Sequence, residues 1–245
     1  DPKGAIVTTE EEHITLNKKN ITEVTVNATV NSPLLWDLDT PELYTVESTV
    51  IIDHKITDVY KTSFGIRSIK FSKDKGFLLN HKPVKFQGVC MHHDQGPLGI
   101  NFRAKQRQLE IMKSMGVNAL RTSHNPPSPE ILKVCDELGI VVIVEAFDEW
   151  KLGKVENGYH LYFDKWHEKD LRDMIKRDRN HPSVIMWSIG NEILEQSRKN
   201  GWETTKMLND ICHDEDPTRP TTVGFNYFPA PFKNNLYKYV DIIGM

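Results

Sequence analysis

The 245-residue sequence has few cysteines, little net charge and no long apolar run. Its three cysteines form an odd, widely spaced set, which excludes a disulfide framework and a cysteine-bound metal ribbon. The formal charge of -3 leaves no broad basic surface, so we expect no nucleic-acid partner. No stretch of about eighteen apolar residues is present, so we expect no membrane span either. The length fits one large α/β domain or two smaller ones.

Up to about residue 66 the sequence carries only strand signals. Alternating apolar residues from Val24 to Val30, the run LYTVESTVII and the segment DVYKTSFGIRSIKF are typical of half-buried strands. Turn-forming asparagine, aspartate and proline residues separate these runs. The pattern predicts part of an antiparallel β-sandwich over residues 1–66, with too few strands to be complete.

Residues 67–245 alternate strand-like and helix-like segments. The run IVVIVEA at 140–146 is continuously apolar, as expected of a strand that is covered on both faces. The segment SPEILKVCDELG has Ser128 as N-cap, Pro129 at the first helical position and Gly139 at the helix end. Repeated βα units with short connections predict a parallel sheet. The other barrel strands are expected at 84–89, 118–123, 184–189, 221–225 and 240–245.

Polar residues at the strand ends distinguish a closed barrel from an open doubly wound sheet. An open sheet gathers its chemistry at one switch point, whereas a barrel builds its site from the carboxyl ends of its strands. Here the first four barrel strands end in Met91–Asp94, Arg121–His124, Glu145 and Asn191–Glu192. No glycine-rich phosphate loop follows the first strand. We therefore predict an α/β fold, an incomplete (β/α)8 TIM barrel of about five to six βα units, because a complete barrel takes about 250 residues.

The stretch HPSVIMWSIGNEI places an amide and a carboxylate at the end of a buried strand. The apolar part would hold Asn191 and Glu192 rigidly over the barrel mouth, and Gly190 would leave room for a ligand. Desolvation raises a carboxyl pKa, so Glu192 could keep a proton near neutral pH and act as a general acid. Asn191 could hydrogen-bond a neutral hydroxyl. The simpler alternative is that both residues cap the following helix.

Four segments resemble consecutive motifs of glycoside hydrolase family 2, which includes β-galactosidases, β-glucuronidases and β-mannosidases. In chain order they are KFQGVCMHHD, NALRTSHNPP, IVVIVEAFDEW and RDRNHPSVIMWSIGNE. The likeness extends from about residue 33 to 245. Its upstream part resembles the end of the family's immunoglobulin-like domain, which implies an immunoglobulin-like β-sandwich before the barrel.

The resemblance implies a retaining exo-β-glycosidase with two carboxylates roughly 5–5.5 Å apart. Glu192 then matches the acid/base, and Asn191 matches the residue that contacts the sugar beside the scissile bond. The other matched substrate-binding residues are His92, His124, Arg121, Glu145, Asp148 and Trp150. Trp150 is expected to stack on a sugar. A core position for His124 and a structural ion pair between Arg121 and Glu145 stay open as alternatives.

Some family members hold magnesium with a glutamate and a histidine after the third barrel strand. Glu149 is available here, but Lys151 stands at the histidine's position, and its ammonium would repel a divalent cation. His92, His93 and Asp94 lie together but lack a distant partner in the sequence that would complete a metal site. We therefore expect no metal and no other cofactor.

The family's nucleophilic glutamate lies at the end of a seventh barrel strand, and the sixth strand of this sequence begins at Val240. We therefore expect a fragment of a longer enzyme, inactive by itself, with a carbohydrate substrate and the remainder of the parent chain as partners. β-Galactosidase is the leading activity, with β-glucuronidase, β-mannosidase or an inactive sugar-binding fragment as alternatives. The opening at Asp1 indicates a processed or excised piece, and we expect a periplasmic or secreted location.

Overall fold

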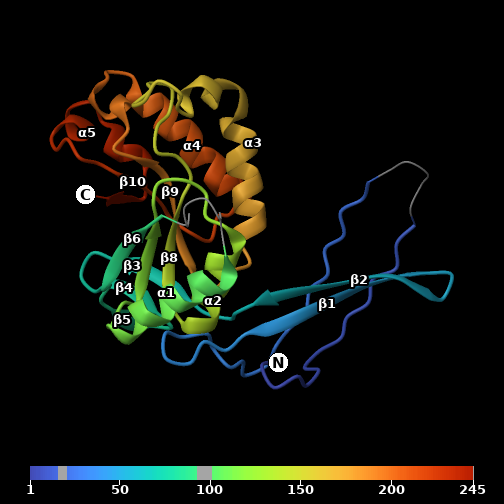
Figure 1. Cartoon of the computed structure of the whole chain (residues 1–245). Coiled ribbons are helices and arrows are strands. Elements are labelled where there is room, and N and C mark those ends of the chain that lie inside the picture. The colour runs from blue at the N-terminus through green and yellow to red at the C-terminus, as the bar shows by residue number, and fades with distance from the viewer. Residues whose placement is uncertain (16–20, 93–100, 245) are drawn as a thin grey trace.

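A six-stranded parallel sheet forms the centre of the protein (Figure 1), whose computed structural model describes residues 1–15, 21–92 and 101–244. Neighbouring strands in this sheet follow one another in sequence, which is the order of a (β/α) barrel and confirms the predicted fold class. An open doubly wound sheet would reverse its strand order. The strands are β6 (Gly88–Met91), β7 (Ala119–Thr122), β8 (Val141–Glu145), β9 (Val184–Asn191), β10 (Thr221–Gly224) and β11 (Ile242–Gly244).

Helices connect the parallel strands. The α-helix α2 ends at Gly139 with a left-handed φ of 67°, as predicted, whereas Ser128 takes the N-cap position without a side-chain cap hydrogen bond. Within the described ranges, none of the helices has the length and apolar character needed to cross a bilayer. The helices are α1 (Phe102–Ser114), α2 (Pro129–Leu138), α3 (His160–Asp178), α4 (Gly201–Glu215) and α5 (Ala230–Lys233), with 3-10 turns η1 (Leu194–Ser197) and η2 (Leu236–Tyr239).

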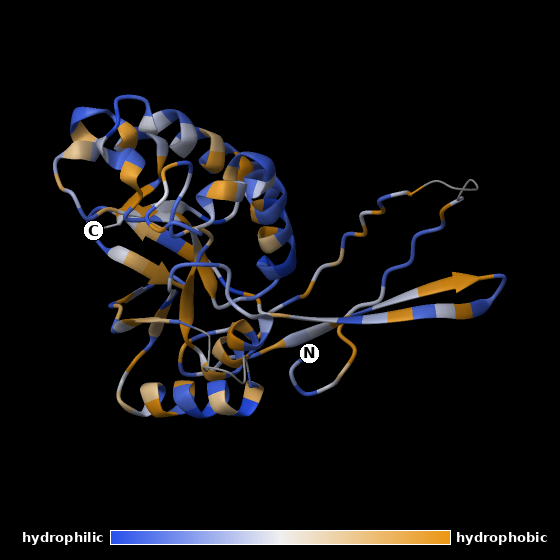
Figure 2. Cartoon of the chain, turned by 45° about the horizontal axis from the view of Figure 1, so that its top comes forward, coloured by the Kyte–Doolittle hydropathy of each residue, from blue (hydrophilic) through white to orange (hydrophobic). Residues whose placement is uncertain are grey.

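The main hydrophobic core lies between the parallel sheet and its helices. Every residue of β9 is buried, and the central strands are strongly hydrophobic while the helices alternate between polar and apolar residues (Figure 2). Trp150, Trp187 and Phe163 are the largest fully buried side chains of this core. Burying one such side chain stabilises the fold by about 1.5–3 kcal/mol. This packing holds β9 in place and thereby positions the residues at its carboxyl end.

A three-stranded antiparallel sheet precedes the barrel, formed by β3 (Ile69–Ser72), β4 (Gly76–Leu79) and β5 (Lys82–Val84). Its Phe77 and Leu79 pack with Trp36 in a second core cluster, which also contains Ala119 and Ile185 from the amino ends of the parallel strands. This sheet therefore covers the end of the barrel opposite the predicted site. The strand expected at 84–89 is divided, because β5 ends before β6 begins.

The first 66 residues are less regular than predicted. The strands β1 (Tyr44–Ile52) and β2 (Lys55–Phe64) pair as an antiparallel ribbon that extends away from the barrel (Figure 1), and an isolated bridge joins Trp36 to Pro41. The strand predicted from Val24 to Val30 is wrong, because residues 21–30 have no regular structure. Alternation produces a strand only where a partner supplies backbone hydrogen bonds, and no strand in the described part pairs with this segment. The domain boundary between residues 66 and 67 stays a prediction.

Candidate active site

Glu145, at the carboxyl end of β8, is completely buried, and both of its carboxylate oxygens have polar partners. Its Oε2 accepts hydrogen bonds from Arg121 Nε at 3.0 Å, Arg121 Nη2 at 2.5 Å and Ser188 Oγ at 2.6 Å. Its Oε1 lies 2.6 Å from His124 Nδ1. A buried carboxylate needs such partners to offset its lost hydration. The buried Glu145 side chain therefore cannot contact a substrate directly, and the prediction that it binds one is wrong. The alternative, an ion pair between Arg121 and Glu145, is what the structure shows.

Arg121 connects β8 to the end of β9. Its Nη2 also donates a hydrogen bond to Asn191 Oδ1 at 2.9 Å. Burial alone would lower the pKa of Arg121, but the charge and hydrogen bonds of Glu145 raise it above its ordinary value. A Cβ atom at Gly224 would lie only 2.7 Å from Arg121 Nη2, so β10 leaves space for the guanidinium by having glycine there. Arg121 is thus a fixed cation that orients the amide of Asn191.

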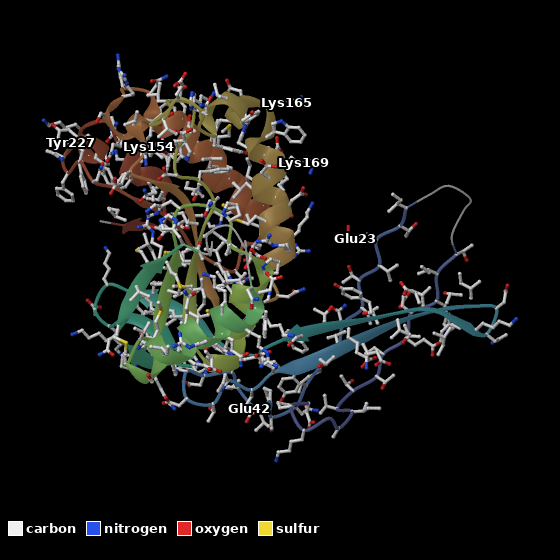
Figure 3. All side chains as sticks on the ribbon, in the orientation of Figure 1. Glu23, Glu42, Lys154, Lys165, Lys169 and Tyr227 are labelled. Carbon is white, nitrogen blue, oxygen red and sulfur yellow. The ribbon has the colours of Figure 1, made fainter. Side chains whose placement is uncertain are left out.

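Asn191, Asp148 and Lys154 form a second polar group at the same edge of the sheet. Asn191 Nδ2 donates to Asp148 Oδ1 at 2.8 Å, and Lys154 Nζ donates to the same oxygen at 2.9 Å. Lys154, labelled in Figure 3, also donates to the backbone carbonyl of Asn191 at 2.7 Å. Burial would raise the pKa of Asp148, but the hydrogen bonds from Asn191 and Lys154 bring it below its ordinary value. Asp148 therefore remains an anion at neutral pH.

Glu192 follows Asn191 with a left-handed φ of 46° and an exposed side chain. Its backbone N–H donates to Gly224 O at 2.7 Å, and its Oε2 accepts from Asn226 Nδ2 at 3.0 Å. The residues that the structure describes leave this carboxyl uncovered, so the partly dry setting stays a prediction for the completed site. The capping alternative is not supported either, since η1 has Ile193 at its N-cap and no side-chain cap hydrogen bond.

The predicted sugar-stacking role of Trp150 is wrong. Trp150 is completely buried in the main core, and its Nε1 donates to Ile189 O at 2.8 Å. Its ring therefore offers no face to a sugar. A Cβ atom at Gly190 would lie 3.0 Å from both Trp150 Cζ2 and Ile193 Cγ2. The glycine thus makes room for core packing, whereas the sequence had suggested room for a ligand.

His92 and His124 stand together at the ends of β6 and β7. Their ring centroids are 5.8 Å apart in an edge-to-face arrangement. His92 is exposed and His124 is half-buried, so neither ring is enclosed in the core. Both rings border a cavity of about 700 Å³, together with Asp148. His93 and Asp94, from the same motif, lie outside the described residues.

Three further residues of this site escaped the sequence analysis. Ser188 belongs to the buried interior of β9, and nothing in the apolar run marks its hydroxyl as a partner of Glu145. Lys154 comes from a loop and carries no strand-end signal. Asn226 follows β10 almost directly, so the rule that polar residues gather at strand ends would have found it.

Glu149 does not fit a magnesium site. Its Oε1 accepts from the backbone N–H of His160 at 2.8 Å and lies 2.9 Å from the ring Nδ1 of the same residue, while Oε2 accepts from the Lys154 N–H at 2.6 Å. Lys151 pairs with Asp164 at 3.0 Å. Over residues 1–15, 21–92 and 101–244, no group of three or more His, Cys, Asp or Glu side chains is arranged to hold a metal ion.

The strand order and the polar side chains at the carboxyl ends define a TIM-barrel domain with an enzyme-like site. Comparison with known families agrees. The pattern described as "Glycosyl hydrolases family 2, TIM barrel domain" matches residues 71–241, and that described as "Glycosyl hydrolases family 2" matches residues 1–67. The chain belongs to glycoside hydrolase family 2, as its motifs predicted.

Similar proteins carry two different activity names. Beta-galactosidase BoGH2A of Bacteroides ovatus is 44% identical in an alignment that covers 90% of this chain and 30% of that protein. Beta-glucuronidase of Streptococcus agalactiae is 33% identical and covers 85% of this chain and 37% of its own length. A solved family 2 member from Bacteroides cellulosilyticus superposes with a TM-score of 0.83 at 44% identity, covering 87% of this chain and 28% of that one. The chain thus spans about a third of the length of these relatives.

Proposed function

We propose that this chain carries the acid/base half of the active site of a retaining exo-β-glycosidase that removes terminal β-linked sugars. The observation that carries the proposal is the arrangement of Asn191 and Glu192. The amide is held between Arg121 and Asp148, and the next carboxyl stands exposed at the same edge. The sugar proposed is β-galactose, because the 44% identical relative is named as a beta-galactosidase.

In this mechanism Glu192 donates a proton to the glycosidic oxygen while the bond to the leaving group breaks. It then accepts a proton from the water that completes hydrolysis. Asn226 Nδ2, at 3.0 Å, orients the carboxyl from the β10 side. His92, His124, Asp148 and the Asn191 amide would hydrogen-bond the sugar hydroxyls. Arg121 and Glu145 act by positioning these groups.

A retaining mechanism also needs a carboxylate nucleophile, and Glu145 is unsuited to that role. It is completely buried, and both of its oxygens already have partners. The family resemblance places the nucleophile at the end of a seventh strand. We therefore propose that residues 1–245 alone have no turnover and that the remainder of a parent chain completes the site.

A Glu192→Gln substitution in the full-length protein tests the acid/base role. We expect kcat/KM for a disaccharide to fall by about 10²–10⁴-fold, since proton donation to a poor leaving group is lost. A nitrophenyl glycoside should lose less, and azide should partly restore its turnover. Glu203→Gln makes the same change at an exposed position of α4 and is the matched control. Equal activity of the two variants would reject the assignment.

β-Glucuronidase is the second candidate, because a 33% identical relative carries that name. Nitrophenyl galactoside, glucuronide and mannoside, compared as substrates of the full-length protein, separate the three sugars.

We also propose a periplasmic or secreted location, and fractionation of the producing cells tests it.

A further inference from the structure

The segment after β10, which comprises a loop and α5, exposes three aromatic side chains, Tyr227, Phe228 and Phe232, which we call the aromatic platform. Their exposed fractions are 60%, 53% and 38%. The ring centroids of Phe228 and Phe232 are 5.1 Å apart, and Phe232 stacks on Tyr237 at 4.9 Å. Exposed apolar clusters on soluble proteins mark places where something binds. We therefore ask which ligand or partner binds to the aromatic platform.

Hydrogen bonds to η1 hold this segment at both ends. Gln196 is buried, and its Nε2 donates to Asn226 Oδ1 at 2.6 Å while its Oε1 accepts from Tyr227 N at 3.2 Å. Farther along, Asn234 Nδ2 donates to Gln196 O at 2.7 Å and to Arg198 O at 2.9 Å. The backbone between these anchors is constrained. The outward direction of the rings is therefore built into the segment.

The platform is directly continuous with the proposed acid/base. Asn226, which precedes Tyr227 in the chain, donates to Glu192 Oε2 at 3.0 Å, and Glu192 N donates to Gly224 O at 2.7 Å. An acid/base carboxyl lies on the leaving-group side of the sugar, because it protonates the oxygen of the bond that breaks. Tyr227 extends outward beside α5 (Figure 3). The platform thus begins next to the residue that holds the carboxyl proposed to protonate the leaving group.

We propose that the aromatic platform is a leaving-group subsite that binds a six-membered ring through its apolar face. The inference rests on the proposed function. Rigid aromatic side chains offer a large apolar surface and favour stacked or edge-on contact with other rings. The ring would belong to a second sugar or to an aromatic aglycone. Substrates whose leaving group lacks a ring would gain nothing from the platform.

The test uses Tyr227→Ala and Phe228→Ala in the full-length enzyme with three substrates of the same sugar. These are a disaccharide, a phenyl glycoside and the glycosyl fluoride, whose leaving group is a single atom. We expect KM to rise and kcat/KM to fall about two- to tenfold for the ring-bearing substrates, in line with the strength of aromatic contacts. The fluoride should be unaffected. A loss with the disaccharide alone or the phenyl glycoside alone identifies which ring the platform takes.

Tyr162→Ala is the matched control, because Tyr162 on α3 is exposed to 57% and lies outside the site. It should leave all three substrates unchanged. Equal losses on the fluoride and the ring-bearing substrates, with or without a lowered unfolding midpoint, would overturn the subsite and assign the platform to contact with another part of the protein. Unchanged activity on every substrate would overturn it too. If the unsubstituted enzyme hydrolyses none of the three, the proposed function and the subsite both fall.

Discussion

At the scale of single residues, Asn191 organises the candidate site. Its Oδ1 accepts from Arg121 and its Nδ2 donates to Asp148, so a flipped amide would lose both hydrogen bonds. Its backbone carbonyl accepts from Lys154, which also contacts Asp148. One loop cation therefore holds both the main chain before Glu192 and the carboxylate that orients the amide.

Lys154→Met should destabilise the protein more than Lys151→Met does. Loss of Lys154 removes one donor to the Asn191 carbonyl and one partner of Asp148, so we expect the free energy of unfolding in urea to fall by about 1–2 kcal/mol at pH 7. Asp148 is 48% exposed, which reduces its share of this loss. Lys151 and Asp164 form an exposed pair, so the control should change stability by less than about 0.5 kcal/mol. Equal effects would contradict the bridging role of Lys154.

The effect of Lys154→Met should also depend on pH. In the folded protein the pKa of Asp148 lies below its ordinary value, because the hydrogen bonds from Asn191 and Lys154 outweigh its burial. Its ionised form thus contributes stability above the unfolded value of about 3.9, and this contribution is lost as pH falls through the folded value. The stability gap between Lys154→Met and the unsubstituted protein should shrink when urea unfolding is repeated from pH 7 towards pH 3. A constant gap would show that the carboxylate plays no part.

At the scale of elements, the carboxyl end of α2 makes a contact that only glycine permits. Gly139 has a φ of 67°, and an added Cβ would lie 2.3 Å from the backbone oxygen of Leu38. Trp36 Nε1 donates to Asp136 O in the same helix at 2.9 Å. The end of α2 therefore receives the segment that precedes β1, and the signal that ends the helix also allows this close approach.

Gly139→Ala should destabilise the protein more than Gly76→Ala. Both glycines have a left-handed φ, 67° and 68°, so the strain of a Cβ costs about 1–2 kcal/mol at each. Gly76 has nothing within 4 Å of the added atom, whereas Gly139 meets Leu38. We expect a further loss of about 1–3 kcal/mol for Gly139→Ala from overpacking, measured by urea unfolding. Similar losses in the two variants would mean that the Leu38 segment moves aside without strain.

At the scale of the whole molecule, Arg67 joins the amino-terminal region to the barrel. Its Nε donates to Pro182 O and its Nη2 to Val184 O, both at 2.6 Å. Val184 opens β9, whose other end carries Asn191. A side chain from outside the parallel sheet thus fixes the start of the strand that positions the site.

Arg67→Met should lower the free energy of unfolding by about 1–3 kcal/mol, because the buried Pro182 carbonyl loses its donor. The Val184 carbonyl keeps a donor, since Arg219 Nε also contacts it at 2.7 Å. Arg67→Lys should recover part of the loss, because an ammonium reaches one carbonyl but lacks the fork of a guanidinium. Unfolding in urea measures both variants. An unchanged midpoint for Arg67→Met would show that the junction does not depend on this contact.

Much of the fold and part of the candidate site could be predicted from the sequence. Apolar runs and their polar ends indicated the parallel strands, and the strand ends located His92, His124, Arg121 and the Asn191–Glu192 pair at one edge. This succeeded because a residue at the end of a parallel strand lies at that edge whatever its distant neighbours are. The strand order followed from short βα connections for the same local reason.

Burial and hydrogen-bond partners, by contrast, were decided only by the tertiary structure. Trp150 has a loop position in the sequence, yet its ring enters the core to meet Ile189. Glu145 is kept from a substrate by its burial and by partners that include Ser188, 43 positions away in the chain. Residues 24–30 alternate like a strand, but no strand among the described residues pairs with them. Each outcome depends on which residues, far apart in the sequence, come into contact in the folded protein, and a local sequence pattern does not show those contacts.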